Sequence, residues 1–292
     1  MNTGHVPLSA AGAAVLVALF IQDLAGQSRY PVVREETISR TLRFGPGVER
    51  RLEVSTISGN IRVVGYDEDA VDVVVRKTVR AETGADADAA EAAVGLEIAE
   101  AAGAIRLLGH VEAQPGCDWE TITRRRTRPR YHVAFDFDVR VPRSTQLRLC
   151  TVNGGAVHVA GTASDFEIDN VNGGITLTGV RGSGRAVTVN GAVSAEFAEN
   201  PKAASSFKSV NGDLDVIFQR NLAADLLMKT FNGGLFTDFD VTRLPTPASA
   251  VERRNGMSVY HGNRFTGYRV GRGGPEITLE TLNGSIRVVS SR

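Results

Sequence analysis

Apolar and polar residues alternate along much of the second half of the chain, in segments that share one frame. Each segment has an apolar residue, then Asn-Gly, then apolar residues three and usually five positions after the asparagine. A period of two is typical of a strand with one buried face, so these segments predict short strands and no helix. The six dipeptides are Asn153-Gly154, Asn172-Gly173, Asn190-Gly191, Asn211-Gly212, Asn232-Gly233 and Asn283-Gly284.

The spacing of these dipeptides indicates an internal repeat. Successive asparagines of the first five copies are 19, 18, 21 and 21 residues apart, and the last step is 51. The long step fits one repeat plus an insertion near 240–270, which holds an off-frame Asn255-Gly256. An outlying copy, Ser58-Gly59, has serine in place of asparagine. One such repeat cannot bury its apolar face alone, so the repeats are expected to stack.

The repeats predict an all-β fold with a parallel β-solenoid (β-helix) of 18–21-residue coils that turn at Asn-Gly corners. Asn-Gly would supply positive φ at each corner, and equivalent residues would stack about 4.8 Å apart, with the asparagines in a ladder. The alternative is an antiparallel meander in which each Asn-Gly closes a hairpin. Two apolar rows are expected to be buried, Val152, Val171, Val189, Val210 and Phe231 in one and Val157, Ile175, Val193, Leu214 and Leu235 in the other.

Residues 30–146 predict an irregular β segment that precedes the repeats. One short helix is expected near 86–94, where alanines follow acidic residues. A hairpin is expected at Ala102-Gly103, between two short apolar runs. The clearest strand patterns are at 51–54, 71–75 and 132–141.

The N-terminus predicts an export signal. Residues 10–21 form an uncharged run of 12, which suits the core of a signal peptide and is short for a membrane span. The expected organisation is therefore a signal peptide or N-terminal anchor at 1–26, the β segment at 30–146 and the repeats at 147–292, continuous with that segment. A buried N-terminal helix is the remaining alternative for the apolar run.

The repeats and the C-terminal motifs resemble the bacterial DUF4097 "putative adhesin" family. Besides the Asn-Gly copies, the similarity is carried by 213–216 (DLDV), 234–239 (GLFTDF) and 271–277 (GRGGPEI) leading into 281–284 (TLNG). It covers roughly residues 50–290. The resemblance implies an exported, envelope-associated protein with a parallel β-solenoid, and it brings no catalytic residues.

Composition narrows the class of protein. Lys plus Arg and Asp plus Glu both number 33, and a chain without a basic excess is not expected to bind nucleic acid. Two cysteines exclude a multi-cysteine metal site, and no cofactor or nucleophile motif occurs. No catalytic, cofactor or metal residue is therefore predicted. Calcium binding is a weaker alternative to a solvated face at three aspartate pairs, Asp136/Asp138, Asp213/Asp215 and Asp238/Asp240.

Two further features are candidates for a functional or stabilising role. Cys117 and Cys150 would form a disulfide if the chain is exported to an oxidising compartment. An arginine-rich loop beside Trp119 is either an anion-binding site or a solvated loop. Its arginines are Arg124, Arg125, Arg126, Arg128 and Arg130.

These observations together predict a non-enzymatic, exported structural or binding protein of the bacterial envelope, similar to an adhesin. Its partner would be an envelope glycan, a lipid headgroup or a protein, and it would need no cofactor. One alternative is a polysaccharide-acting β-helix enzyme, which requires clustered carboxylates on adjacent coils. The other is an extracytoplasmic sensor that partners a membrane regulator.

Overall fold

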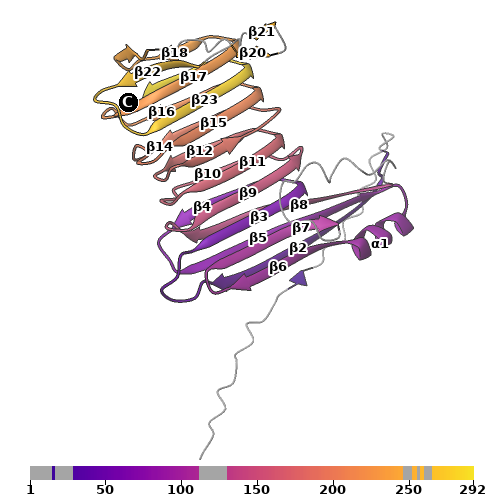
Figure 1. Cartoon of the computed structure of the whole chain (residues 1–292). Helices are drawn as coiled ribbons and strands as arrows, with labels where there is room; N and C mark the ends of the chain where they lie inside the picture. The colour runs from indigo at the N-terminus through magenta and orange to yellow at the C-terminus, as the bar shows by residue number, and fades with distance from the viewer. Residues whose placement is uncertain (1–14, 17–28, 112–129, 246–251, 255–256, 260–264) are drawn as a thin grey trace, which may run out of the picture.

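The computed structural model describes residues 15–16, 29–111, 130–245, 252–254, 257–259 and 265–292. In these residues the chain is almost wholly β, with a single helix, as the alternating pattern predicts. The strands form two 11-stranded sheets, called here the first and second sheets, and a separate two-stranded sheet (Figure 1).

The strand order in each sheet differs from the chain order. The first sheet runs β1 (Val15–Leu16), β2 (Val32–Arg43), β5 (Ala70–Ala81), β8 (Tyr131–Pro142), β4 (Ile61–Tyr66), β10 (Val157–Ala160), β12 (Ile175–Val180), β14 (Val193–Phe197), β16 (Leu214–Phe218), β24 (Ile286–Ser290) and β18 (Leu235–Thr237). The second sheet runs β19 (Val241–Arg243), β22 (Thr266–Val270), β17 (Ala224–Asn232), β23 (Glu276–Asn283), β15 (Ser205–Asn211), β13 (Gly184–Val187), β11 (Phe166–Asn172), β9 (Gln146–Asn153), β3 (Arg51–Ser58), β7 (Ala104–Val111) and β6 (Val94–Ala101).

Neighbouring repeats pair in parallel and in register. Val157 faces Ile175, Ile175 faces Val193, and Val193 faces Leu214 along β10, β12, β14 and β16. The meander is therefore wrong for these repeats. Each repeat forms one layer, defined as a strand of the second sheet followed, through its Asn-Gly corner, by a strand of the first sheet. The sheets as a whole are mixed, since pairs such as β2–β5, β6–β7 and β17–β22 are antiparallel.

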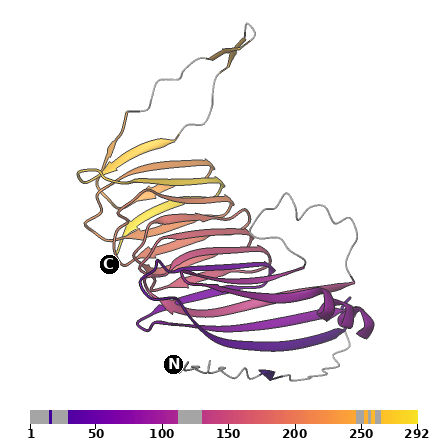
Figure 2. The same cartoon turned by 60° about the horizontal axis from the view of Figure 1, so that its bottom comes forward.

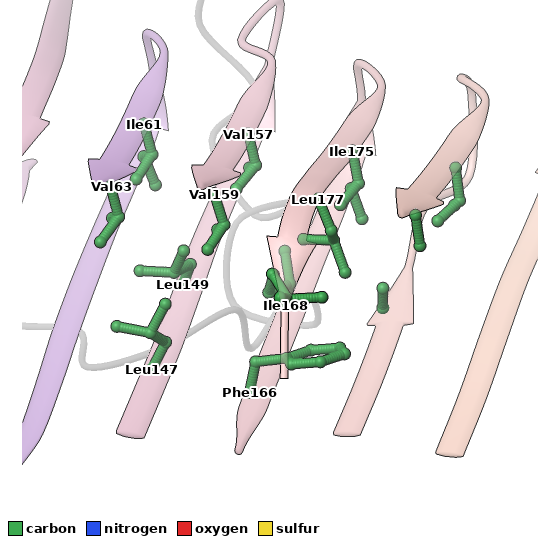
Figure 3. Close-up of a cluster of buried hydrophobic side chains, with 14 of the residues drawn as sticks. Ile61, Val63, Leu147, Leu149, Val157, Val159, Phe166, Ile168, Ile175 and Leu177 are labelled. Atoms are coloured by element: carbon green, nitrogen blue, oxygen red, sulfur yellow. The ribbon is translucent and has the colours of Figure 1, made fainter. Parts of the chain in front are cut away.

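Apolar side chains from both sheets fill the space between them (Figure 3). Val157, Ile175 and Val193 of the first sheet are at most 1% exposed, and Ile168 of the second sheet is fully buried. Complete burial of such a side chain is worth about 1.5–3 kcal/mol, so stacking of layers supplies most of the stabilisation. Leu235 is only half-buried because β18, at the edge of the first sheet, has a neighbour on one side alone.

The row of residues immediately before the asparagines is not the buried row that the sequence predicted. Val152 is 8% exposed, but Val189 is 36%, Val210 39% and Phe231 65% exposed. The reason is the phase of the alternation. The residue two positions before each asparagine points inward, so the residue just before the asparagine points outward.

The inward positions two before each asparagine carry polar side chains that form an internal polar row. Each side chain donates a hydrogen bond of 2.7–2.9 Å to a glycine carbonyl of an adjacent layer. The carbonyls lie in corners, outside the strand ladders, so this bond satisfies a group that the sheets leave open. The pairs are Thr151 to Gly59, Asn170 to Gly155, Thr188 to Gly173, Ser209 to Gly191, Thr281 to Gly212 and Thr230 to Gly284.

At the C-terminal end the layers do not follow the chain. The last layer, β23 with β24, lies between the layers β15–β16 and β17–β18. Asn283 therefore pairs with Asn211 on one side and with Asn232 on the other. The expected stacking of Asn232 on Asn283 is confirmed, but the direct stacking of Asn232 on Asn211 is wrong.

Charged side chains favour this order of layers. Glu280 of β23 lies between Lys208 of β15 and Lys229 of β17, at 3.2 and 2.8 Å. Direct pairing of β15 with β17 in the same register would place the two lysines opposite each other, which is destabilising. A similar arrangement occurs at the N-terminal end, where β3 lies between β7 and β9. Glu53 of β3 lies opposite Arg106 on one side and Arg148 on the other, so it separates the two arginines.

The N-terminal segment contains the expected helix and hairpin. Helix α1 (Gly84–Ala93) begins after Thr83, whose hydroxyl accepts a hydrogen bond from the Asp86 amide. Its buried Ala87 and Ala90 pack in a small cluster with residues of β5. Strands β6 and β7 form the hairpin that the Ala102-Gly103 turn predicts.

The insertion also contains strands. Within 240–270, β19 and β22 pair with each other and β22 pairs with β17, all antiparallel. Strands β20 (Glu252–Arg254) and β21 (Met257–Val259) form the separate antiparallel sheet (Figure 2). The off-frame Asn255-Gly256 falls between β20 and β21, outside the described residues.

The expected signal peptide at 1–26 lies outside the described residues except for β1, which pairs with β2. No helix in the part of the chain that the structure describes is long and apolar enough to cross a membrane. Export through the 10–21 run therefore stays a prediction.

Candidate binding surface

The six corner asparagines form a continuous row of amide hydrogen bonds, called here the asparagine ladder. Counted from Asn153, the Nδ2 group of each later asparagine donates to the Oδ1 atom of the asparagine before it in the row, over 2.7–3.3 Å. The ladder follows the layers, not the chain, in the order Asn153, Asn172, Asn190, Asn211, Asn283 and Asn232. Ser58 pairs with Asn153 and ends the row of amides on that side.

The ladder has a direction. Every donor points towards Asn153, so Asn232 donates to Asn283 and its own Oδ1 accepts no hydrogen bond among the described residues. Hydrogen bonds in a chain polarise one another, which makes the terminal acceptor a stronger one. The exposed end of the ladder is thus an amide oxygen at the C-terminal end of the sheets.

Beside the ladder runs an exposed apolar stripe, formed by the residues just before the asparagines. Its exposed fraction rises to 36% at Val189, 39% at Val210, 46% at Leu282 and 65% at Phe231. In the order of the layers these four residues are consecutive, because Leu282 lies between Val210 and Phe231. Contiguous exposed apolar residues of this kind are typical of binding surfaces.

A second exposed ring lies on the other side of the last corner. Phe236 of β18 is 53% exposed. Its ring lies against Gly234, where an added Cβ would come 2.6 Å from the Phe236 Cε2 atom. Any residue with a Cβ at position 234 would collide with the Phe236 ring, so glycine is needed there.

The charged residues around the stripe are paired with one another. Lys208 and Lys229 both contact Glu280, and Arg287 bonds Asp215 at 2.8 Å. The hydrogen bond from Lys229, with a smaller contribution from Lys208, lowers the pKa of the Glu280 carboxyl below its ordinary value. The surface beside the ladder consequently offers amides and apolar side chains, with these charged groups held in ion pairs and one positive charge in excess at the Lys208–Glu280–Lys229 group.

Most of the corner glycines are required by close packing between layers and not by a positive φ. Gly154 has the predicted positive φ, 66°, and Gly284 also has a positive φ. The same prediction is wrong for Gly173, Gly191, Gly212 and Gly233, which lie outside that region. At each of these four, an added Cβ would collide with a glycine carbonyl oxygen of the adjacent layer.

The aspartate pairs hold the scaffold together. Asp136 accepts from both the backbone and the side chain of Asn60, and Asp213 accepts from the Ser285 amide. Asp238 accepts from Ser290. No group of three or more metal-ligating side chains occurs in the described part of the chain.

The other candidates are only partly within the described residues. Cys150 is buried and disulfide-bonded, while Cys117, the only other cysteine of the chain, lies outside them. Of the arginine-rich loop, Arg130 is described and exposed, and its carbonyl accepts from the Glu82 amide. Arg124, Arg125, Arg126 and Arg128 lie outside the described residues.

The surface also has a shallow depression on the second sheet. It is lined by Glu167, Arg185 and Glu276 among others. Arg185 already bonds Asp169 at 2.6 Å and lies 4.0 Å from Glu167. Arg185 is thus engaged with carboxylates of the neighbouring strand, and Glu276 accepts a hydrogen bond from the Thr278 hydroxyl.

Comparison with known proteins leaves the family open, since no family model and no curated protein matches the chain. One similar solved structure is a "putative cell adhesion protein" from Clostridium sporogenes, with 11% identity, a TM-score of 0.43 and coverage of 87% of this chain and 100% of that one. A "putative adhesin" from Bacteroides fragilis has 12% identity, a TM-score of 0.38 and coverage of 87% and 97%. A "putative lipid binding protein" from Parabacteroides distasonis has 10% identity, a TM-score of 0.29 and coverage of 88% and 97%. At these values the likeness assigns neither family nor function.

Sequence reasoning identified the ladder positions but missed the stripe. The available signal was the residue two before each corner, which is always Thr, Ser or Asn. Such side chains at an inward position suit a bond to a corner carbonyl. With these polar residues assigned to the inner face, the alternation predicts that the Val, Leu or Phe after each of them is exposed.

Proposed function

We propose that the protein is a non-enzymatic, adhesin-like binding protein of the bacterial envelope, built as a β-solenoid and exported through its N-terminal apolar run. The binding surface is the asparagine ladder together with the exposed apolar stripe. The stripe carries this proposal, since four apolar side chains in consecutive layers are exposed although the same chain buries apolar rows throughout its core.

The scaffold suits such a role. Stacked layers hold the ladder and stripe on paired strands, so the surface needs little ordering when a ligand binds. The polar groups along the edge are amides, which can donate and accept hydrogen bonds but carry no charge to drive acid–base chemistry.

The test compares binding of the full-length chain and of a Val189→Ser/Val210→Ser variant to isolated bacterial envelopes. Loss of these contacts is expected to weaken binding about tenfold. Val74→Ser is the matched control, because Val74 is a strand valine, 44% exposed, on β5. It should bind like the wild type.

Equal binding by the stripe variant and the wild type would contradict the assignment of the surface. Hydrolysis is assayed in the same samples. Release of reducing ends from envelope polysaccharides by the wild type would show that the protein is an enzyme.

A further inference from the structure

We propose that the C-terminal end of the ladder, formed by Asn232 with Phe231 and Phe236, binds a neutral polysaccharide. This inference rests on the proposed function and names the class of ligand for the same surface. Phe231 and Asn232 are the last two residues of β17 and Phe236 lies in β18, at the end of both the ladder and the stripe.

The two rings are the most exposed large apolar side chains in the described residues, at 65% for Phe231 and 53% for Phe236. They lie one on each side of the Asn232 corner, Phe231 on the outer face of the second sheet and Phe236 on that of the first. An aromatic ring offers a flat apolar face on which the C–H groups of a pyranose can pack. A solvent-exposed ring without such a partner leaves apolar area in water, which is unfavourable.

Asn232 adds the polar part of the site. Its amide nitrogen is held by Asn283 over 2.7 Å, which fixes the plane of the group. The Oδ1 atom accepts no bond among the described residues and lies at the polarised end of a five-bond chain of amides. An oriented, uncharged acceptor suits a sugar hydroxyl, which donates one hydrogen bond.

The surrounding charges favour a ligand without charge. Glu280 contacts both of the lysines nearest the stripe, which leaves one positive charge in excess in this group, and Asp215 pairs with Arg287, the residue opposite Phe236. An anionic headgroup or an acidic polysaccharide would require unpaired cations here. Burial of these paired groups under a charged ligand would cost desolvation without a new partner.

The ladder also fits a polymer. Its amides repeat once per layer, about 4.8 Å apart, and an extended chain of pyranose units advances by a similar length per sugar. A polysaccharide that packs on Phe231 can therefore continue along Leu282, Val210 and Val189 with its hydroxyl groups over successive asparagines. A single sugar would contact only the terminal residues, so affinity should rise with chain length.

The experiment measures binding of the full-length chain to soluble neutral polysaccharides, namely dextran, mannan, xylan and mixed-linkage β-glucan, and to their oligosaccharides of increasing length. Binding to at least one of them, tighter for longer chains, is expected. Phe231→Ala and Phe236→Ala should each weaken it about two- to tenfold. Val48→Ala, at a valine that is 41% exposed and far from the ladder in the chain, is the control and should leave binding unchanged.

Three outcomes overturn the proposal. They are binding to none of the polysaccharides, equal binding by the phenylalanine variants and the wild type, and binding only to liposomes or to a second copy of the chain. The proposed function fails separately, when the Val189→Ser/Val210→Ser variant retains full binding to isolated envelopes. Thermal unfolding of each variant confirms that the exposed substitutions leave the fold intact.

Discussion

The contacts of the internal polar row predict how much stability the protein loses when Thr188 is replaced by valine. Its hydroxyl is buried, with 1% of the residue exposed, and donates to the Gly173 carbonyl over 2.8 Å. The same carbonyl receives no backbone amide in the described turns and loops. Thr188→Val keeps the shape of the side chain but leaves this carbonyl without its donor.

The expected cost follows from that contact. A buried acceptor left without a partner costs about 1–3 kcal/mol, and the extra methyl group of valine places the result towards the lower end. Thr281→Val, which removes the equivalent bond to Gly212, should cost about the same because the two contacts are nearly identical, at 2.8 and 2.9 Å.

Urea unfolding followed by far-UV circular dichroism measures the effect. With an m-value of about 3 kcal/mol/M, the midpoint should fall by about 0.3–1 M. Thr178→Val is the matched control, because Thr178 lies on β12 and is exposed. It should change stability by less than about 0.5 kcal/mol. If Thr188→Val were as mild as this control, the polar row would contribute nothing to stability and the reasoning would be refuted.

Three further predictions test the packing, the ion pairs and the disulfide. Gly212→Ala should destabilise strongly in the same urea assay because its Cβ collides with a carbonyl of the adjacent layer, whereas Gly95→Ala, with open space around it, should be nearly neutral. The pKa of Glu280 is lower in the folded state than its ordinary value of 4.5. The carboxylate therefore contributes fully to the free energy of unfolding above about that pH, and the contribution is lost as pH falls through the folded pKa. Glu280→Gln should be less stable at neutral pH, and its free energy of unfolding should fall less steeply as the pH is lowered. Cys150→Ser should cost about 3–4 kcal/mol, and thiol titration of the unfolded, unreduced chain should find no free thiol if Cys150 pairs with Cys117.

The local sequence pattern predicted more of the fold than of the candidate binding surface. Period-two alternation and the recurring frame predicted the strands, and most residues three after an asparagine, such as Ile175 and Leu214, are buried as expected, although Leu235 is only half-buried. The Thr83 cap and the alanines of α1 likewise specified a helix from local residues alone. The prediction that the residue before each corner points inward was wrong. Valine suits either face of a strand, and only its neighbours in the tertiary structure decide which face it takes.

The sequence by itself determined that this chain stacks short, equivalent strands with small residues at the corners, because each repeat is written in the same frame. Only the tertiary structure decided the order of the layers, which depends on contacts between residues far apart in the chain. Glu280 lies between Lys208 and Lys229 because charge and register favour β23 there, although β23 follows β17 in sequence. That arrangement leaves Asn232 and Phe231 at the end of the ladder, where no further asparagine among the described residues donates to Asn232.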